Sequence, residues 1–116
     1  MHELSIVMSI VDIANKEAIK ADVESFSKIS LEIGSQSGIV MEALDFAWET
    51  GVKGSVLQQA KREIISIQAK AQCKDCNEVF EVESLYDVCP KCNSYMSEII
   101  QGKELKILAL EFESKN

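Results

Sequence analysis

The chain has 116 residues, of which 47% are hydrophobic, and these values suit one small domain with a true core, or such a domain plus a metal-stabilised module. Acidic residues outnumber basic ones by 19 to 12, and no stripe of Lys and Arg is visible, which argues against a surface that follows nucleic-acid phosphates. No apolar run approaches the roughly 18 residues that span a membrane. The first residues lack the basic and apolar segments of a signal peptide, so the expected location is the cytoplasm.

The first half of the chain predicts a helix, a strand and a second helix. Residues 4–21 carry apolar side chains at helical spacing, residues 26–33 alternate between apolar and polar, and residues 39–50 again have a helical pattern. Gly34 is expected to end the strand, and Gly51 to stop the second helix. The side chains that form the apolar faces are Leu4, Val7, Ile10, Val11, Ala14 and Ala18 of the first helix, Ile29, Leu31 and Ile33 of the strand, and Val40, Ala43, Leu44, Ala47 and Trp48 of the second helix.

The second half of the chain predicts two strands around a cysteine-rich module. Residues 61–71 are interpreted as one long strand, the module follows from residue 72, and residues 104–113 form the last strand after a turn at Gly102. The strand–helix–strand portion before the module predicts a right-handed crossover between parallel strands.

The element order predicts an α+β fold of an α/β-like kind, in which two helices cover a small three-stranded mixed sheet. A four-cysteine zinc module of knuckles and short β-hairpins is inserted between the last two strands of that sheet. Residues 1–71 plus 102–116 are therefore expected to form an α/β domain, and residues 72–101 a zinc-binding module.

Four cysteines in one short span predict a metal site. Cys73 and Cys76 form one Cys-x-x-Cys pair, and Cys89 and Cys92 form a second pair after twelve residues. Two such knuckles that face each other supply four thiolates in a tetrahedron, which suits zinc. Four ligands leave no open position for water, so the site is expected to be structural. Asn77 and Asn93 follow the second cysteine of each pair, where a positive φ is often required, while Val79, Phe80 and Val82 are expected to form part of a hairpin beneath the metal.

Other readings of the cysteines remain open from the residues alone. Two disulfides would suit an oxidising compartment, a redox Cys-x-x-Cys would need only one pair, and rubredoxin-type iron uses similar knuckles. Lys74 and Lys91 lie inside the knuckles, where they either offset part of the negative charge of the thiolates or simply keep the loops soluble.

The only histidine is His2, and its position creates a second candidate metal site. The α-amine of Met1, the amide nitrogen and imidazole of His2, and a backbone or carboxylate donor of Glu3 can surround one metal ion. Nitrogen donors in a plane suit Ni(II) or Cu(II). The residues alone favour a frayed terminus with a chance histidine, although the terminus opens directly into a predicted helix. A phosphate-binding loop and a Ser-His-Asp arrangement are both absent from the sequence, so an enzyme is not expected.

Several segments in order resemble the HypA-type hydrogenase nickel-incorporation proteins. They are Met1-His2-Glu3-Leu4-Ser5, Leu31-Glu32-Ile33-Gly34, Glu42-Ala43-Leu44, the Cys-x-x-Cys and Cys-Pro-x-Cys pairs, and Gly102-Lys103-Glu104-Leu105 through Leu110-Glu111. The resemblance implies a nickel metallochaperone that is not an enzyme. Ni(II) would bind weakly at His2 with the Met1 amine and Glu3, in the α/β domain, and zinc tightly at the four cysteines.

The resemblance also implies partners. Such proteins deliver nickel to the large subunit of [NiFe]-hydrogenase together with a HypB-type GTPase, and in some bacteria they also serve urease and its accessory proteins. The chain departs from the family at Asn77 and Asn93, where glycine is common, and it lacks histidines beside the cysteine pairs. In some members such histidines are thought to let zinc coordination respond to pH, and for this chain that response stays an open question.

Two alternative functions follow from the cysteine pairs. A zinc-ribbon module that binds nucleic acid or protein would be detected, in the nucleic-acid case, by a gel-shift assay at low salt. An electron-transfer protein with iron in the cysteines would be coloured.

Overall fold

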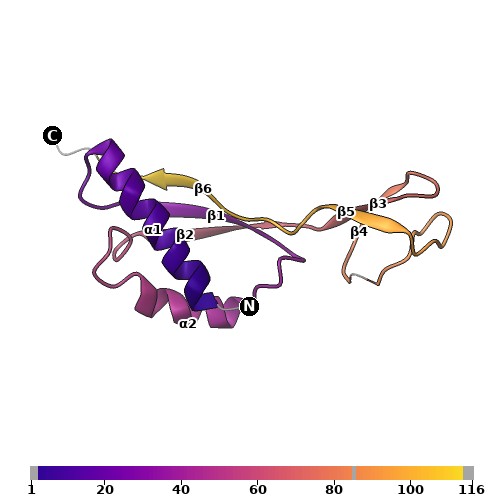
Figure 1. Ribbon diagram of the computed structural model, residues 1–116, viewed down its shortest axis with the longest axis horizontal. Coiled ribbons are helices and arrows are strands. Elements are labelled where there is room, and N and C mark those ends of the chain that lie inside the picture. Colours follow the sequence, from indigo (N-terminus) through magenta and orange to yellow (C-terminus); the bar gives the residue numbers. More distant parts are fainter. Residues whose placement is uncertain (1–2, 85, 114–116) are drawn as a thin grey trace. The chain divides into compact units, whose positions relative to one another are not determined.

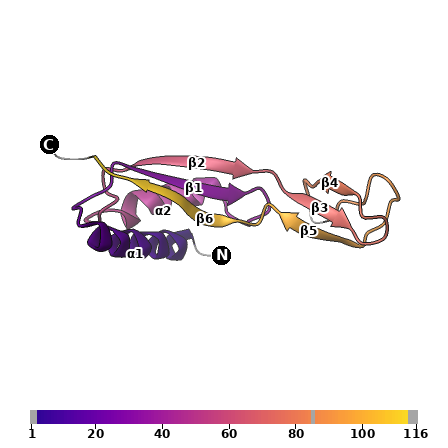
Figure 2. The ribbon, with the colours of Figure 1, turned by 90° about the horizontal axis from the view of Figure 1, so that it is seen from above.

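The computed structural model describes residues 3–84 and 86–113, which form two helices and six strands (Figures 1 and 2). In chain order these are α1 (Glu3–Ala21), β1 (Lys28–Gly34), α2 (Met41–Gly51), β2 (Lys61–Ile67), β3 (Lys70–Cys73), β4 (Val79–Glu81), β5 (Ser97–Gln101) and β6 (Leu105–Glu111). The strands make two three-stranded sheets with the orders β2-β1-β6 and β4-β3-β5. No helix within the described residues is long and apolar enough to cross a bilayer.

The first sheet is mixed, as the sequence predicts. Figure 2 shows β1 and β2 running in the same direction and β6 running against them. The antiparallel pairing is confirmed by the backbone, where the N–H of Ser27 donates to the carbonyl of Glu111 and the N–H of Gly34 donates to that of Glu104, each at 2.8 Å. Because α2 lies between β1 and β2 in the chain, this helix makes the predicted crossover between the two parallel strands.

Among the described residues, those up to Leu31, Ile39–Ile64 and those from Ile107 onward form one compact unit, and those of Glu32–Gly38 with Ile65–Lys106 form another. The core of the first unit is built from the apolar faces that the helical spacing predicts. Its buried side chains are Val7, Ile10, Val11, Ala14 and Ala18 of α1, Phe26, Ile29 and Leu31 in and beside β1, Leu44, Ala47 and Trp48 of α2, and Val52 and Leu57 of the following connection. Three residues of the predicted faces are not buried. Leu4 is 50% exposed, Val40, which precedes α2, is 58% exposed, and Ala43 is partly buried.

The predicted strand over residues 61–71 is wrong in one respect, because two strands occupy it. β2 ends at Ile67, and β3 begins at Lys70 in the other sheet. Between them the N–H of Ala69 donates to the Ser35 hydroxyl at 2.9 Å, and its carbonyl accepts the N–H of Val82 at 2.9 Å. These hydrogen bonds take the place of those between strands of the first sheet. The chain therefore passes from the first sheet to the second without a turn-forming residue.

Gly102 permits a close approach within the second unit. Its φ is +107°, and a Cβ at this position would lie 2.2 Å from the Cα of Ala69. Only glycine satisfies both conditions.

The second sheet has its own small core. β3 pairs antiparallel with β4 and β5, so Ala71 lies opposite both Phe80 and Ile99. Ala69, Ala71 and Val82 are buried, and Phe80 and Ile99 pack against them. Val79 and Phe80 lie in β4, paired with β3, which confirms that they form part of a hairpin. Phe80 and Val82 contribute to the small core, while Val79 is 47% exposed.

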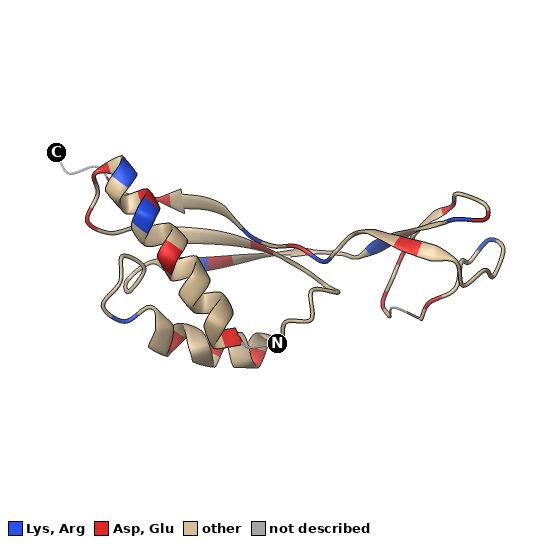
Figure 3. Cartoon of the chain, in the orientation of Figure 1, with Lys and Arg blue, Asp and Glu red and all other residues tan. Residues whose placement is uncertain are grey.

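Charged residues are distributed along the described elements, with Lys and Arg at scattered positions (Figure 3). Several basic side chains have acidic neighbours. Lys28 lies 3.3 Å from Glu63 and 3.7 Å from Glu111, and Lys106 lies 3.2 Å from Glu32. Such exposed pairs contribute little to stability, but they neutralise the lysines locally.

Candidate metal centre

Each cysteine pair lies on a tight turn whose shape is set by backbone hydrogen bonds. The first turn begins at the end of β3, where the N–H of Asn77 donates to the carbonyl of Cys73 at 2.9 Å. The second turn repeats the bond, with the N–H of Asn93 donating to the carbonyl of Cys89 at 2.8 Å. Asn77 and Asn93 have φ values of +65° and +62°, which confirms the predicted left-handed conformation after each pair.

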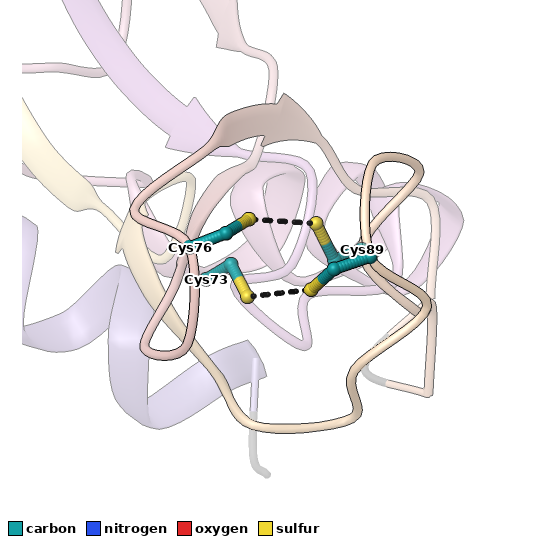
Figure 4. Close-up of side chains that lie close together, drawn as sticks. Cys73, Cys76 and Cys89 are labelled. Atoms are coloured by element: carbon teal, nitrogen blue, oxygen red, sulfur yellow. Dashed lines mark hydrogen bonds between the residues drawn. The ribbon is translucent and has the colours of Figure 1, made fainter.

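The two turns face each other, and their sulfur atoms converge (Figure 4). The Sγ atoms of Cys73 and Cys92 are 3.6 Å apart, as are those of Cys76 and Cys89, and all four sulfurs lie within 4.8 Å of one another. A tetrahedral zinc site with Zn–S bonds of about 2.3 Å needs sulfur atoms about 3.8 Å apart. The four cysteines, all of them free, therefore fit one tetrahedral metal ion.

Backbone N–H groups that point at the sulfurs favour the thiolate form, whereas burial opposes it and the neighbouring thiols act in both directions. The N–H of Cys76 lowers the pKa of Cys73 to about 7, although burial raises it. The N–H of Glu78 lowers the pKa of Cys76, but burial and the Cys89 thiol together raise it by more. The net shift of the Cys76 pKa is therefore upward.

The pKa of Cys92 shows the strongest conflict between donors and neighbouring thiols. The backbone N–H of Ser94 lowers it, but the Cys73 thiol, burial and the remaining thiols raise it to about 12. Thiols this close cannot all ionise unless a cation binds among them. The arrangement of donors and sulfurs is thus suited to a cation rather than to four independent thiols.

Zinc fits this donor set, and it would leave no room for a further ligand. Cys73 and Cys89 are buried and Cys76 is partly buried, whereas Cys92 is exposed. A closed ring of four sulfurs has no open position for water or substrate, which is the pattern of a structural rather than a catalytic site.

The sequence-predicted nickel ligands are separate from the cysteines along the chain. Met1 and His2 lie outside the described residues. Glu3 is the first residue of α1, so the predicted opening of the terminus into a helix is confirmed from Glu3 onward. The first N–H groups of a helix have no partner within it, and this leaves the backbone nitrogen of Glu3 free of the helical ladder.

Two residues of the metal centre were not singled out by the sequence. The hydroxyl of Ser94 donates a hydrogen bond to Asp75, which joins the second cysteine turn to the first. Polar residues in loops carry no periodic signal, and only the fold brings these two positions together.

Comparison with known proteins covers nearly the whole chain. The family model described as hydrogenase/urease nickel incorporation, metallochaperone, hypA matches residues 1–112. The hydrogenase maturation factor HypA of Parabacteroides distasonis is 37% identical over 110 residues, which is 95% of this chain and 96% of that protein. The factor of the same name from Francisella philomiragia is 40% identical over 112 residues, with 97% and 99% covered.

Solved structures agree in fold. The solution structure of the Ni metallochaperone HypA from Helicobacter pylori matches with a TM-score of 0.71 and 32% identity, covering 99% of this chain and 100% of that one. A second solution structure of a HypA protein matches with a TM-score of 0.74, also at 32% identity.

Proposed function

The chain belongs to the HypA family and is a nickel metallochaperone of hydrogenase maturation, and from this premise we propose which residues hold each metal and how nickel is carried. We propose that Cys73, Cys76, Cys89 and Cys92 bind zinc and that Met1, His2 and Glu3 bind Ni(II). The observation that carries this assignment is the closed geometry of the four sulfurs, which lie within 4.8 Å of one another. Such a site has no free position for cargo.

Nickel is then assigned to the terminus because the rest of the chain has no histidine and its four cysteines are assigned to zinc. His2 is the only histidine, and imidazole is a preferred donor for Ni(II). The Met1 amine and the His2 amide complete fused chelate rings, and Glu3, at the first position of α1, supplies the remaining donor. A site of few protein donors at a chain end suits a carrier that must release its metal, rather than a catalyst.

The proposal extends to partners and location. We propose that a HypB-type GTPase assists the transfer, that the large subunit of [NiFe]-hydrogenase receives nickel, and that urease accessory proteins form a second route. The matching family description, which includes urease as well as hydrogenase, supports the second route. A cytoplasmic location is supported by the four thiols, because a reducing compartment keeps thiols available to metal.

Calorimetric titration of Ni(II) into untagged, zinc-loaded protein tests the nickel assignment. His2→Ala should abolish binding, while zinc content and helical circular dichroism stay unchanged. A second sample with an N-terminal tag lacks the free Met1 amine and should bind nickel more weakly, although His2 is present. Undiminished affinity in the His2 variant would rule out the terminal site, and equal affinity of the tagged protein would rule out amine ligation.

A further inference from the structure

The two cysteine turns are held together by one short segment, residues 94–96. The backbone N–H of Lys74, in the first turn, donates to the carbonyl of Met96 at 2.7 Å. The backbone N–H of Cys89, in the second turn, donates to the carbonyl of Ser94 at 3.0 Å. The segment therefore contacts both turns through the backbone, before any side chain is considered.

Ser94 adds a side-chain connection between the same two turns. Its hydroxyl donates to the carboxylate of Asp75, which lies between Cys73 and Cys76, and it accepts the N–H of Met96 at 3.0 Å. The second bond fixes the direction in which the hydroxyl points. Ser94 is partly buried, whereas Asp75 and the hydrogen bond between them are exposed to solvent.

Ser94 also acts directly on a sulfur. Its backbone N–H donates a hydrogen bond to the Cys92 sulfur. A change in the position of Ser94 would move this donor away from one metal ligand and loosen the Asp75 turn that carries two others. With the bond from the Cys89 N–H to its carbonyl, Ser94 is thus connected to the positions of all four sulfurs.

The charge of Asp75 makes this contact informative. Four thiolates and one Zn²⁺ already carry a formal charge of −2, so an additional carboxylate in the ligand turn is electrostatically unfavourable. Among residues 3–84 and 86–113, the Ser94 hydroxyl is the hydrogen-bond donor to this side chain. The Asp75 carboxylate is a strong acceptor for the Ser94 hydroxyl, because hydrogen bonds to charged groups are the stronger ones.

We propose that the Asp75–Ser94 hydrogen bond is a clamp that holds the two cysteine turns at the separation zinc needs and so sets how slowly zinc leaves. The proposal rests on the zinc assignment made above. Both residues are positioning residues, since neither ligates the metal. Removing an interaction that orients ligands typically changes metal affinity by about 10- to 100-fold. We expect the clamp to act mainly on the rate of release.

The test measures zinc release from the purified full chain after excess EDTA is added, with a colorimetric zinc indicator in parallel samples. Ser94→Ala and Asp75→Ala should each release zinc about tenfold faster or more. Ser94→Thr keeps the hydroxyl, so it should stay close to the wild-type rate. Asp75→Asn keeps an acceptor oxygen but loses the charge, so its rate should lie between those of wild type and Asp75→Ala. Ser84→Ala is the matched control, because Ser84 lies in the same unit and its hydroxyl accepts the N–H of Tyr86 at 3.2 Å instead of contacting a cysteine turn.

Three further measurements separate positioning from a general loss of stability. The double variant Asp75→Ala/Ser94→Ala should release zinc no faster than either single variant, because both remove the same bond. In cobalt-substituted protein, Ser94→Ala should shift the visible d–d bands that report the geometry of the four sulfurs, and Ser84→Ala should not. Helical circular dichroism should be the same in every variant.

The outcomes distinguish the clamp from the zinc assignment. Wild-type protein without bound zinc would overturn both. Zinc-loaded wild type with an unchanged release rate in Ser94→Ala would overturn the clamp alone, as would failure of Ser94→Thr to restore slow release. Fully multiplicative effects of the two alanine substitutions would also overturn it, because independent effects are incompatible with one shared bond.

Discussion

Zinc binding by the four cysteines should release protons, and the number follows from the thiol pKa values. At pH 7 the Cys73 thiol, whose pKa is lowered to about 7 chiefly by the Cys76 backbone N–H, is half ionised before metal arrives. Cys76 and Cys92 are still protonated, because the pKa of each is raised, that of Cys92 to about 12. Metal binds the thiolate form, so these three cysteines should release about two and a half protons, half from Cys73 and one from each of the others.

The direction of the pH dependence follows from the same numbers. As pH falls through 7, Cys73 becomes protonated as well. The apparent zinc affinity then decreases, and it decreases more steeply with each further unit of acidification. Each released proton changes the apparent affinity tenfold per pH unit, which gives a fall of about 300-fold per unit of acidification near pH 7 from these three groups. Stability that zinc confers on the second unit should be lost over the same range.

Calorimetry at pH 7 in buffers with different ionisation enthalpies counts the protons directly. The slope of the observed binding heat against buffer ionisation enthalpy should correspond to at least two protons per zinc. Chelator competition at pH 6, 7 and 8 gives an independent value from the change in affinity. One proton or fewer by both methods would refute the reasoning, because it would mean that the metal-free thiols are already ionised or that fewer sulfurs bind.

Two substitutions test the packing, both measured by urea unfolding of zinc-loaded protein. Gly102→Ala places a Cβ 2.2 Å from the Cα of Ala69 at a φ of +107°, so it should destabilise the fold by at least about 2 kcal/mol. The control Gly54→Ala has a φ of +74° and open space around the new Cβ, so it should destabilise the fold by about 1 kcal/mol. Equal costs would show that the close approach does not matter. Leu44→Ala empties a fully buried position and should cost about 2–5 kcal/mol, whereas Phe46→Ala, at a side chain 78% exposed, should stay within about 0.5 kcal/mol. A larger loss from Phe46 than from Leu44 would contradict the burial of the α2 face.

The parts of the fold that the sequence predicts well are those with local, repeated signals. The cysteine spacing predicts that four sulfurs converge, because two short loops of fixed geometry leave few other arrangements. Asn77 and Asn93 are predicted at positive φ because few other non-glycine residues tolerate it. The apolar faces of α1 and α2 follow from helical periodicity, with exceptions near their beginnings, where Leu4 and Val40 are exposed.

The parts that the sequence does not predict depend on contacts between distant segments. The break between β2 and β3 occurs at Ala69, whose N–H bonds to the side chain of Ser35 rather than to a neighbouring strand. A run of strand-forming residues gives no sign of such a change of partner. The bond between Asp75 and Ser94 is equally hidden, since both positions are polar loop residues separated by other turns.

The central claim is that nickel and zinc occupy different sites, with the cargo at the terminus and zinc in the closed set of four sulfurs. X-ray absorption at the nickel edge, on untagged protein loaded with both metals, tests this most directly. The account predicts that nitrogen and oxygen scatterers surround the nickel and that four sulfurs surround the zinc. Thiolate sulfur in the nickel coordination shell would contradict it, because the cargo would then occupy the cysteine site.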